Sequence, residues 1–168
     1  MNELPKEYNY ELGFIILWHL GLGTLPEQVT VQGFELLRKP EFHISLVCAY
    51  KLAQLIDLKN KQRVEKEIVD EFKKFVGNQS LAAYKLLPEF RFAQREHKKT
   101  LVVMTEVPGL SDFFDTLRQK FQIDLPSQPA HITLYALQPN AGIRIFTDEE
   151  LQHDSIPVEV PELRTLLS

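Results

Sequence analysis

The stretch PAHITLY, residues 129–135, decides the fold of this chain together with EFHISLV, residues 41–47, which repeats the same residue pattern earlier in the sequence. Both contain a histidine, an apolar residue, a hydroxyl residue and a second apolar residue, within runs rich in β-branched and aromatic side chains. Such runs are typical of β-strands, in which successive side chains point to opposite faces. Each histidine should therefore share a strand face with the hydroxyl that follows it. The residues assigned to that face are His43 and Ser45 in the first strand, and His131, Thr133 and Tyr135 in the second.

Short strands and amphipathic helices are predicted for most of the remaining chain. Apolar runs predict strands over 12–20, 28–37, 84–94 and 100–107, the second of them bulged at Gly33. Helical spacing predicts helices over 49–58, 60–76 and 110–121, the last with Ser111 as its N-cap. The sequence TDEE, residues 147–150, resembles the capping-box start of another short helix, and one more strand is expected in the tail after it. Residues 1–11 are polar and are expected to form an irregular segment before the first strand. Together, these elements predict the α+β fold class.

The two histidine strands lie about half a chain length apart, which indicates a loose duplication. We expect residues 1–168 to form one domain with two similar lobes, one histidine strand in each. Two antiparallel sheets would then face each other across a central cleft, with the helices outside. Both histidines would meet in that cleft.

Composition and charge limit the classes of partner. With 168 residues and a formal net charge of −4, the chain is unlike proteins that coat long nucleic acids through many Lys and Arg contacts. A small phosphate ligand in a local cleft remains compatible with that charge. The single cysteine, Cys48, excludes an internal disulfide framework and is expected to be buried on the face of Ile44 and Leu46. No signal peptide or membrane span is evident, so a cytoplasmic location is expected. The chain is also expected to be a monomer.

Two opposed histidines suit phosphodiester cleavage by acid–base catalysis. An unperturbed imidazole titrates near pH 6.5, so one ring can be neutral while the other is protonated. The neutral ring removes a proton from an attacking water, and the protonated ring gives one to the departing sugar oxygen. A hydroxyl two residues later can donate to a non-bridging phosphate oxygen. This chemistry needs no metal and no cofactor.

The paired HISL (43–46) and HITL (131–134) resemble the motifs of the 2H phosphoesterase superfamily, which includes bacterial 2′-5′ RNA ligase-like proteins and 2′,3′-cyclic phosphodiesterases. The resemblance implies a bilobal fold with pseudo-two-fold symmetry and both motifs lining one cleft. It also implies metal-independent hydrolysis of cyclic phosphates or 2′-5′ linkages on nucleotides or short RNA. By this resemblance His43 and His131 are the acid–base pair, and Ser45 and Thr133 hold the phosphate. The sequence leaves open which histidine is the acid, which substrate is cleaved, and whether ligation or hydrolysis is favoured.

The sequence is compatible with more than one role for several other residues. Tyr135 could contact a base or sugar or simply pack, and three arginines could meet a second phosphate or lie on the surface: Arg91, Arg95 and Arg144. The remaining histidines are expected to be structural or superficial, with His19 the one that could approach the cleft. A zinc site is disfavoured because the motifs supply two histidines with hydroxyls rather than carboxylates beside them. The alternatives to an enzyme are a module that binds a nucleotide or RNA end without cleaving it, and a structural partner protein.

Overall fold

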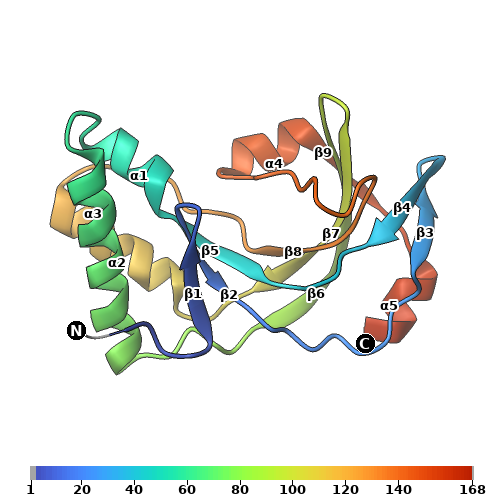
Figure 1. The fold of residues 1–168 in the computed structure, drawn as a ribbon, viewed down its shortest axis with the longest axis horizontal. Helices are drawn as coiled ribbons and strands as arrows, with labels where there is room; N and C mark the ends of the chain where they lie inside the picture. The colour runs from blue at the N-terminus through green and yellow to red at the C-terminus, as the bar shows by residue number, and fades with distance from the viewer. Residues whose placement is uncertain (1–2, 168) are drawn as a thin grey trace.

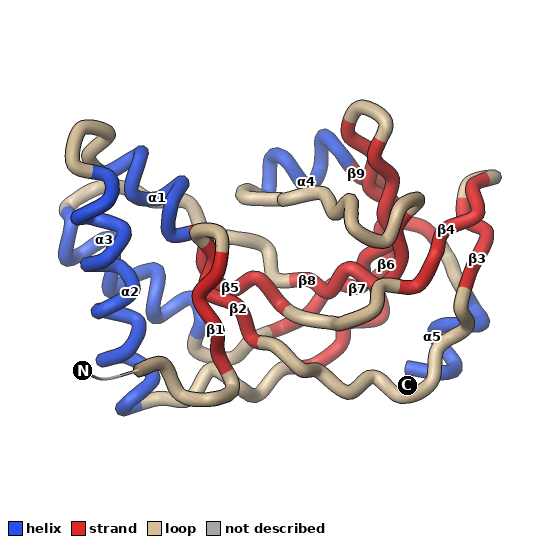
Figure 2. Tube along the Cα trace, in the orientation of Figure 1, coloured by secondary structure: helices blue, strands red, loops and turns tan. Residues whose placement is uncertain are grey.

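The computed structural model describes residues 3–167. Within that range the chain forms one antiparallel sheet of nine strands and five helices, which confirms the α+β class (Figures 1 and 2). The strands are β1 (Tyr8–Glu11), β2 (Phe14–Leu17), β3 (Gln28–Val31), β4 (Phe34–Arg38), β5 (Ile44–Cys48), β6 (Lys85–Arg95), β7 (Lys98–Glu106), β8 (His131–Ala136) and β9 (Ser155–Val158). The helices are α1 (Ala49–Ile56), α2 (Lys61–Asn78), α3 (Leu110–Phe121), α4 (Asp148–Asp154) and α5 (Pro161–Leu167).

The strand order places the two histidine strands side by side in the middle of the sheet. The order is β1-β2-β5-β8-β7-β6-β9, and the hairpin of β3 and β4 joins through the pairing of β4 with β8. Outward from the junction of β5 and β8, each side continues with a hairpin, β2–β1 on one side and β7–β6 on the other. That junction is a single registered pair, Ile44 opposite Ile132. Where the sequence predicted two separate sheets, this pairing joins all strands of the described residues into one.

One predicted single strand, 28–37, is in fact the hairpin of β3 and β4, whereas the other, 12–20, contains β2 alone and begins in the turn that joins it to β1. Within 12–20 the chain turns at Leu12 and Gly13, whose φ angles are 51° and 84°, and within 28–37 at Gln32 and Gly33, with 52° and 80°. Positive φ at both central residues is the backbone of a type I′ turn, which connects tightly paired antiparallel strands. The predicted bulge at Gly33 was therefore wrong, and the irregular segment expected before residue 12 contains β1.

The predicted helices and the strands over 84–94 and 100–107 are confirmed, with small shifts at their ends. Gly109 rather than Ser111 is the N-cap of α3, and it has the positive φ of 89° that glycine tolerates. Thr147 caps α4 as the sequence predicted, by accepting a hydrogen bond from the Glu150 backbone N–H. The expected strand in the tail is β9, and α5 after it was not foreseen.

Two clusters of buried apolar side chains pack the helices and the segment 137–147 against the sheet. The larger cluster joins the central strands to helices α1–α3, which gather at one end of the molecule (Figure 1). Edge-to-face ring contacts reinforce it, among Tyr8, Phe72, Phe75, Phe113 and Phe114. The smaller cluster packs the segment 137–147 and α4 against β6 and β7, through Ala93, Val102, Met104, Ile143, Ile145 and Leu151. The segment 137–147 thereby becomes one wall of the pocket described next.

Candidate functional site

One pocket of about 480 Å³ is lined by both histidine–hydroxyl motifs. Its walls come from the β1–β2 hairpin, the beginnings of β5 and β8 with the residues before them, the end of β6, the start of β7 and the segment 140–145. The structure thus brings together four of the five site residues predicted from the sequence, namely His43, Ser45, His131 and Thr133. A volume of this size falls within the range of clefts that hold ligands as large as a nucleotide, about 300–1,000 Å³.

The register of β5 against β8 arranges these four side chains. Ile44 lies opposite Ile132 in antiparallel pairing, so the residues that flank each isoleucine point to the other face of the sheet. A shift of one residue would turn either motif away from the pocket. On the pocket face, this register sets Ser45 across from His131 and Thr133 across from His43. Each histidine therefore has the hydroxyl of the other motif as its cross-strand neighbour, and the two histidines stand on a diagonal.

A β-bulge follows the hydroxyl residue in both motifs. Opposite β2 the register skips Leu46, and opposite β7 it skips Leu134, which are the fourth residues of HISL and HITL. An extra residue on one strand reverses the alternation for the residues after it. The two motifs thus share their backbone irregularity as well as their residue pattern.

The bulge at Leu134 overturns the prediction that Tyr135 faces the site. Tyr135 pairs with Leu101 on the face opposite the pocket, is fully buried, and does not line the pocket. Its hydroxyl donates a hydrogen bond of 2.7 Å to the Pro26 carbonyl. Tyr135 therefore packs in the core of the described chain, outside the pocket.

The bulge at Leu46 has the same consequence for Cys48. The sequence predicted burial on the face of Ile44 and Leu46, and the burial is confirmed at 1% exposure. The face was wrong, because Cys48 pairs with Phe14, which lines the pocket. Burial raises the pKa of the Cys48 thiol to about 11, so the group stays protonated and unreactive near neutrality.

His131 is held in one tautomer by a backbone carbonyl two residues before it. It is the first residue of β8, is 8% exposed, and its Nδ1 lies 2.9 Å from the Pro129 carbonyl oxygen. Because a carbonyl only accepts, Nδ1 carries the proton, and in the neutral ring the lone pair is on Nε2. Burial lowers the pKa of His131 from its ordinary 6.5, the Pro129 hydrogen bond opposes this shift, and the charge of His43 lowers the pKa further. The His43 ring is therefore close enough for its charge to act on the pKa of His131.

His43 occupies the more open side of the same pocket. It lies immediately before β5 and is exposed, yet enough protein surrounds the ring for desolvation to lower its pKa from 6.5. The Lys39 ammonium lowers this pKa as well, while the carboxylates of Glu11 and Glu41 raise it. Both motif histidines are thus biased toward the neutral form before any ligand binds.

The pocket also presents polar groups that have no partner within the protein. Among residues 3–167, neither the Ser45 nor the Thr133 hydroxyl makes a hydrogen bond, although both residues line the pocket. Gln128 donates from Nε2 to the Ser45 carbonyl at 3.1 Å, and this bond fixes the orientation of its amide. The Oε1 of Gln128 is then a buried acceptor without a donor in the described chain. Buried polar atoms are nearly always paired, so a ligand or water that brings a donor is expected here.

Cations surround the pocket although the whole chain is acidic. Lys39, Lys98 and Arg144 line it, and within residues 3–167 none of the three forms an ion pair with a carboxylate. Arg95 also lines it, but its guanidinium is held by Asp154 and Glu150. Of the three arginines proposed to meet a second phosphate, Arg144 alone has its charge uncompensated in the pocket. Arg91 is buried and bonded to Ser155 and Glu89, so it is structural.

Comparison of the chain with protein-family models, with curated proteins and with solved structures finds no match. Two further observations concern metals and membranes. No three or more His, Cys, Asp or Glu side chains among residues 3–167 are grouped as metal ligands would be. None of the helices in that range has the length and apolar character needed to cross a bilayer. His19, the histidine that could have approached the cleft, is exposed and does not line the pocket.

Proposed function

We propose that this protein is a metal-independent phosphodiesterase of the 2H type, which hydrolyses 2′,3′-cyclic phosphates or 2′-5′ linkages of nucleotides or short RNA. The observation that carries the proposal is the pairing of Ile44 with Ile132. An antiparallel pair has a local two-fold axis, and the axis through this pair relates HISL to HITL residue by residue, bulges included. This relation supports a bilobal, pseudo-two-fold arrangement in which the two motifs act on one phosphorus atom.

In the proposed reaction each motif supplies one proton transfer. One histidine, neutral, takes a proton from a water whose oxygen attacks phosphorus. The phosphorus–oxygen bond to the departing sugar oxygen breaks, and the other histidine, protonated, gives that oxygen its proton. Water is consumed, and a phosphomonoester and a free sugar hydroxyl are formed. Both histidines need an accessible ring nitrogen, and the Pro129 hydrogen bond leaves Nε2 of His131 available for this.

The hydroxyls and the amide complete the site. Ser45 and Thr133 have hydroxyl groups with no partner in the described chain, and we assign them to the non-bridging oxygens, where negative charge grows in the transition state. The buried Oε1 of Gln128 would accept from a hydroxyl of the substrate or from the attacking water. Because Gln128 also bonds to the Ser45 carbonyl, it ties the segment before β8 to β5.

Incubation with defined phosphodiesters tests the proposal directly. The four nucleoside 2′,3′-cyclic phosphates and a 2′-5′ dinucleotide, with and without EDTA, are resolved by chromatography after incubation. We expect at least one of them to be hydrolysed at a rate that EDTA does not change, because two imidazoles supply both proton transfers. A nucleotide that binds but survives long incubation would favour the binding module instead, and a requirement for added metal would contradict the mechanism.

The pH dependence follows from the shared direction of the two pKa shifts. The base must be neutral and the acid protonated, so kcat/KM peaks midway between the two pKa values of the free enzyme. Both values lie below 6.5, and the optimum of kcat/KM is expected on the acidic side of that value. A bound phosphate anion favours both imidazolium forms, so the optimum of kcat should lie at higher pH. Rates measured from about pH 5 to about pH 8.5 give the pH optima of kcat/KM and of kcat. A kcat/KM optimum above about pH 7.5 would contradict the lowered pKa values of the two histidines.

A further inference from the structure

The segment 137–147 is built to present Arg144 to the pocket. Its neighbours Ile143 and Ile145 are 6% and 2% exposed and pack into the smaller apolar cluster. Arg144 lies between them, is exposed, and lines the pocket. Its backbone carbonyl accepts a hydrogen bond of 2.7 Å from the Arg95 guanidinium. The backbone is thus anchored on both sides of Arg144, whose side chain makes no hydrogen bond or ion pair within residues 3–167.

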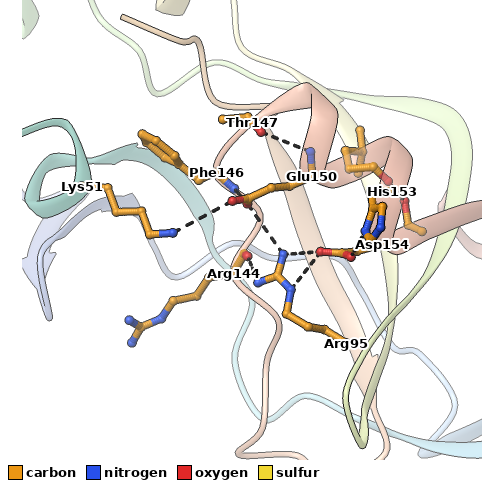
Figure 3. A network of polar contacts seen from close by, with 10 residues as sticks. Lys51, Arg95, Arg144, Phe146, Thr147, Glu150, His153 and Asp154 are labelled. Atoms are coloured by element: carbon orange, nitrogen blue, oxygen red, sulfur yellow. Dashed lines mark hydrogen bonds and ion pairs between the residues drawn. The ribbon is translucent and has the colours of Figure 1, made fainter. Parts of the chain in front are cut away.

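Ion pairs hold the Arg95 anchor in place. Arg95 donates from Nε to Asp154 at 2.8 Å and lies 3.6 Å from Glu150, which also accepts from the Phe146 backbone N–H at 2.7 Å (Figure 3). These carboxylates compensate the charge of Arg95. In Figure 3 the side chain of Arg144 extends away from this network. Its guanidinium lies over the ring of Phe14, 4.9 Å from the centroid, and so rests on β2 across the pocket from its own segment.

The charge around the pocket exceeds what one phosphodiester requires. Lys39, Lys98 and Arg144 carry three positive charges and make no ion pair with a carboxylate in residues 3–167. Among those residues, Glu11 is the one carboxylate that lines the pocket. A cyclic phosphate or a phosphodiester linkage carries one negative charge. In a chain with a net charge of −4, this local excess points to a ligand with more than one anionic group.

We infer that Arg144, supported by Phe14, forms a second anion subsite that binds a phosphate group other than the one being cleaved. The ligand class, which rests on the proposed function, is a nucleotide or RNA end with a further phosphate beyond the scissile one. A guanidinium with one face on an aromatic ring keeps its edge N–H groups free, and these match two oxygens of a phosphate. Lys98, which also lines the pocket, adds a second donor of positive charge.

Titration calorimetry with adenosine 3′,5′-bisphosphate and adenosine 3′-monophosphate, and with their 2′ isomers, tests the subsite. We expect the unaltered protein to bind the bisphosphate at least about tenfold more tightly than the monophosphate, as a charge-assisted hydrogen bond provides. Arg144→Gln should reduce that ratio to about twofold or less, and Arg144→Lys should retain part of it because the charge remains. Arg63→Gln makes the same change in net charge on the exposed face of α2 and should leave the ratio unchanged.

Three results would overturn the inference. They are equal affinities of the unaltered protein for the bisphosphate and the monophosphate, no binding of either ligand, or an equal loss of affinity for both ligands in Arg144→Gln. The last result would indicate that Arg144 stacks on the base instead of binding phosphate. A clear preference for the bisphosphate without hydrolysis of any cyclic phosphate would leave the subsite in place and reject the proposed reaction, so the two failures can be told apart.

Discussion

Replacement of either pocket histidine, His43→Asn or His131→Asn, is expected to lower kcat/KM for a cyclic phosphate by about 10²–10⁴-fold, the usual contribution of a positioned proton-transfer group. Each ring supplies one of the two transfers, and no other histidine lines the pocket in the described residues. Asparagine suits position 131 because its amide can still donate to the Pro129 carbonyl. The loss therefore reports proton transfer more than folding.

His19→Asn is the matched control. His19 is exposed, lies outside the pocket and has a φ of 57°, a backbone conformation that asparagine adopts more readily than most residues. Initial rates and thermal melting are measured on all three variants. Unaltered rates in either pocket variant, or an equal loss in His19→Asn, would reject the acid–base assignment, and melting temperatures separate these results from misfolding.

Simple alternation correctly placed each histidine and the following hydroxyl on one strand face, because both motifs are regular up to the hydroxyl residue. His131 and Thr133 share the pocket face, as an extended strand requires. Alternation fails immediately afterwards, at Leu134 and Leu46, where each strand contains a bulge. Whether a strand bulges depends on how the neighbouring strand pairs with it, and that neighbour is distant in sequence. Tyr135 and Cys48 were misassigned for this one reason.

The turns that the sequence analysis missed have a local cause. A glycine within an apolar run fits a bulge, a bend or a turn, and the sequence alone does not distinguish them. At Gly13 and Gly33 the preceding residue also has a positive φ, which completes a type I′ turn without the asparagine that usually signals one. The helices were easier to predict, because α2 and α3 carry apolar residues at helical spacing over more than two turns.

The pocket residues that the sequence did not single out lie in or beside loops. Lys39 follows β4, Gln128 precedes β8, and Lys98 begins β7 after a tight turn. Their approach to the histidines depends on the strand order, which brings β5 and β8 together at a single registered pair. Isolated lysines and glutamines are common on surfaces, so no pattern marks them. Gln128 becomes informative only once its amide oxygen is seen to be buried and unpaired.

Thr133→Val should lower kcat by about 10²–10³-fold, because it removes one hydrogen-bond donor aimed at charge that grows on the phosphate. Valine matches the shape of threonine, and the Thr133 hydroxyl makes no hydrogen bond within the described chain. The folded state therefore loses little, and the effect should fall on kcat more than on KM. Ser45→Ala is expected to act in the same direction, since Ser45 has the corresponding place in the other motif.

Thr105→Val is a closely matched control for the same chemical change. Thr105 lies on the neighbouring strand β7, is buried, does not line the pocket, and its hydroxyl also lacks a partner in residues 3–167. Removal of a buried hydroxyl that makes no hydrogen bond is neutral or stabilising, so Thr105→Val should keep its rate and melt at the same or a higher temperature. If Thr133→Val behaves like Thr105→Val, the pocket hydroxyls do not stabilise the transition state. A selective loss in Thr133→Val, with both variants equally folded, would assign the hydroxyl to the phosphate, because the pocket is what distinguishes the two sites.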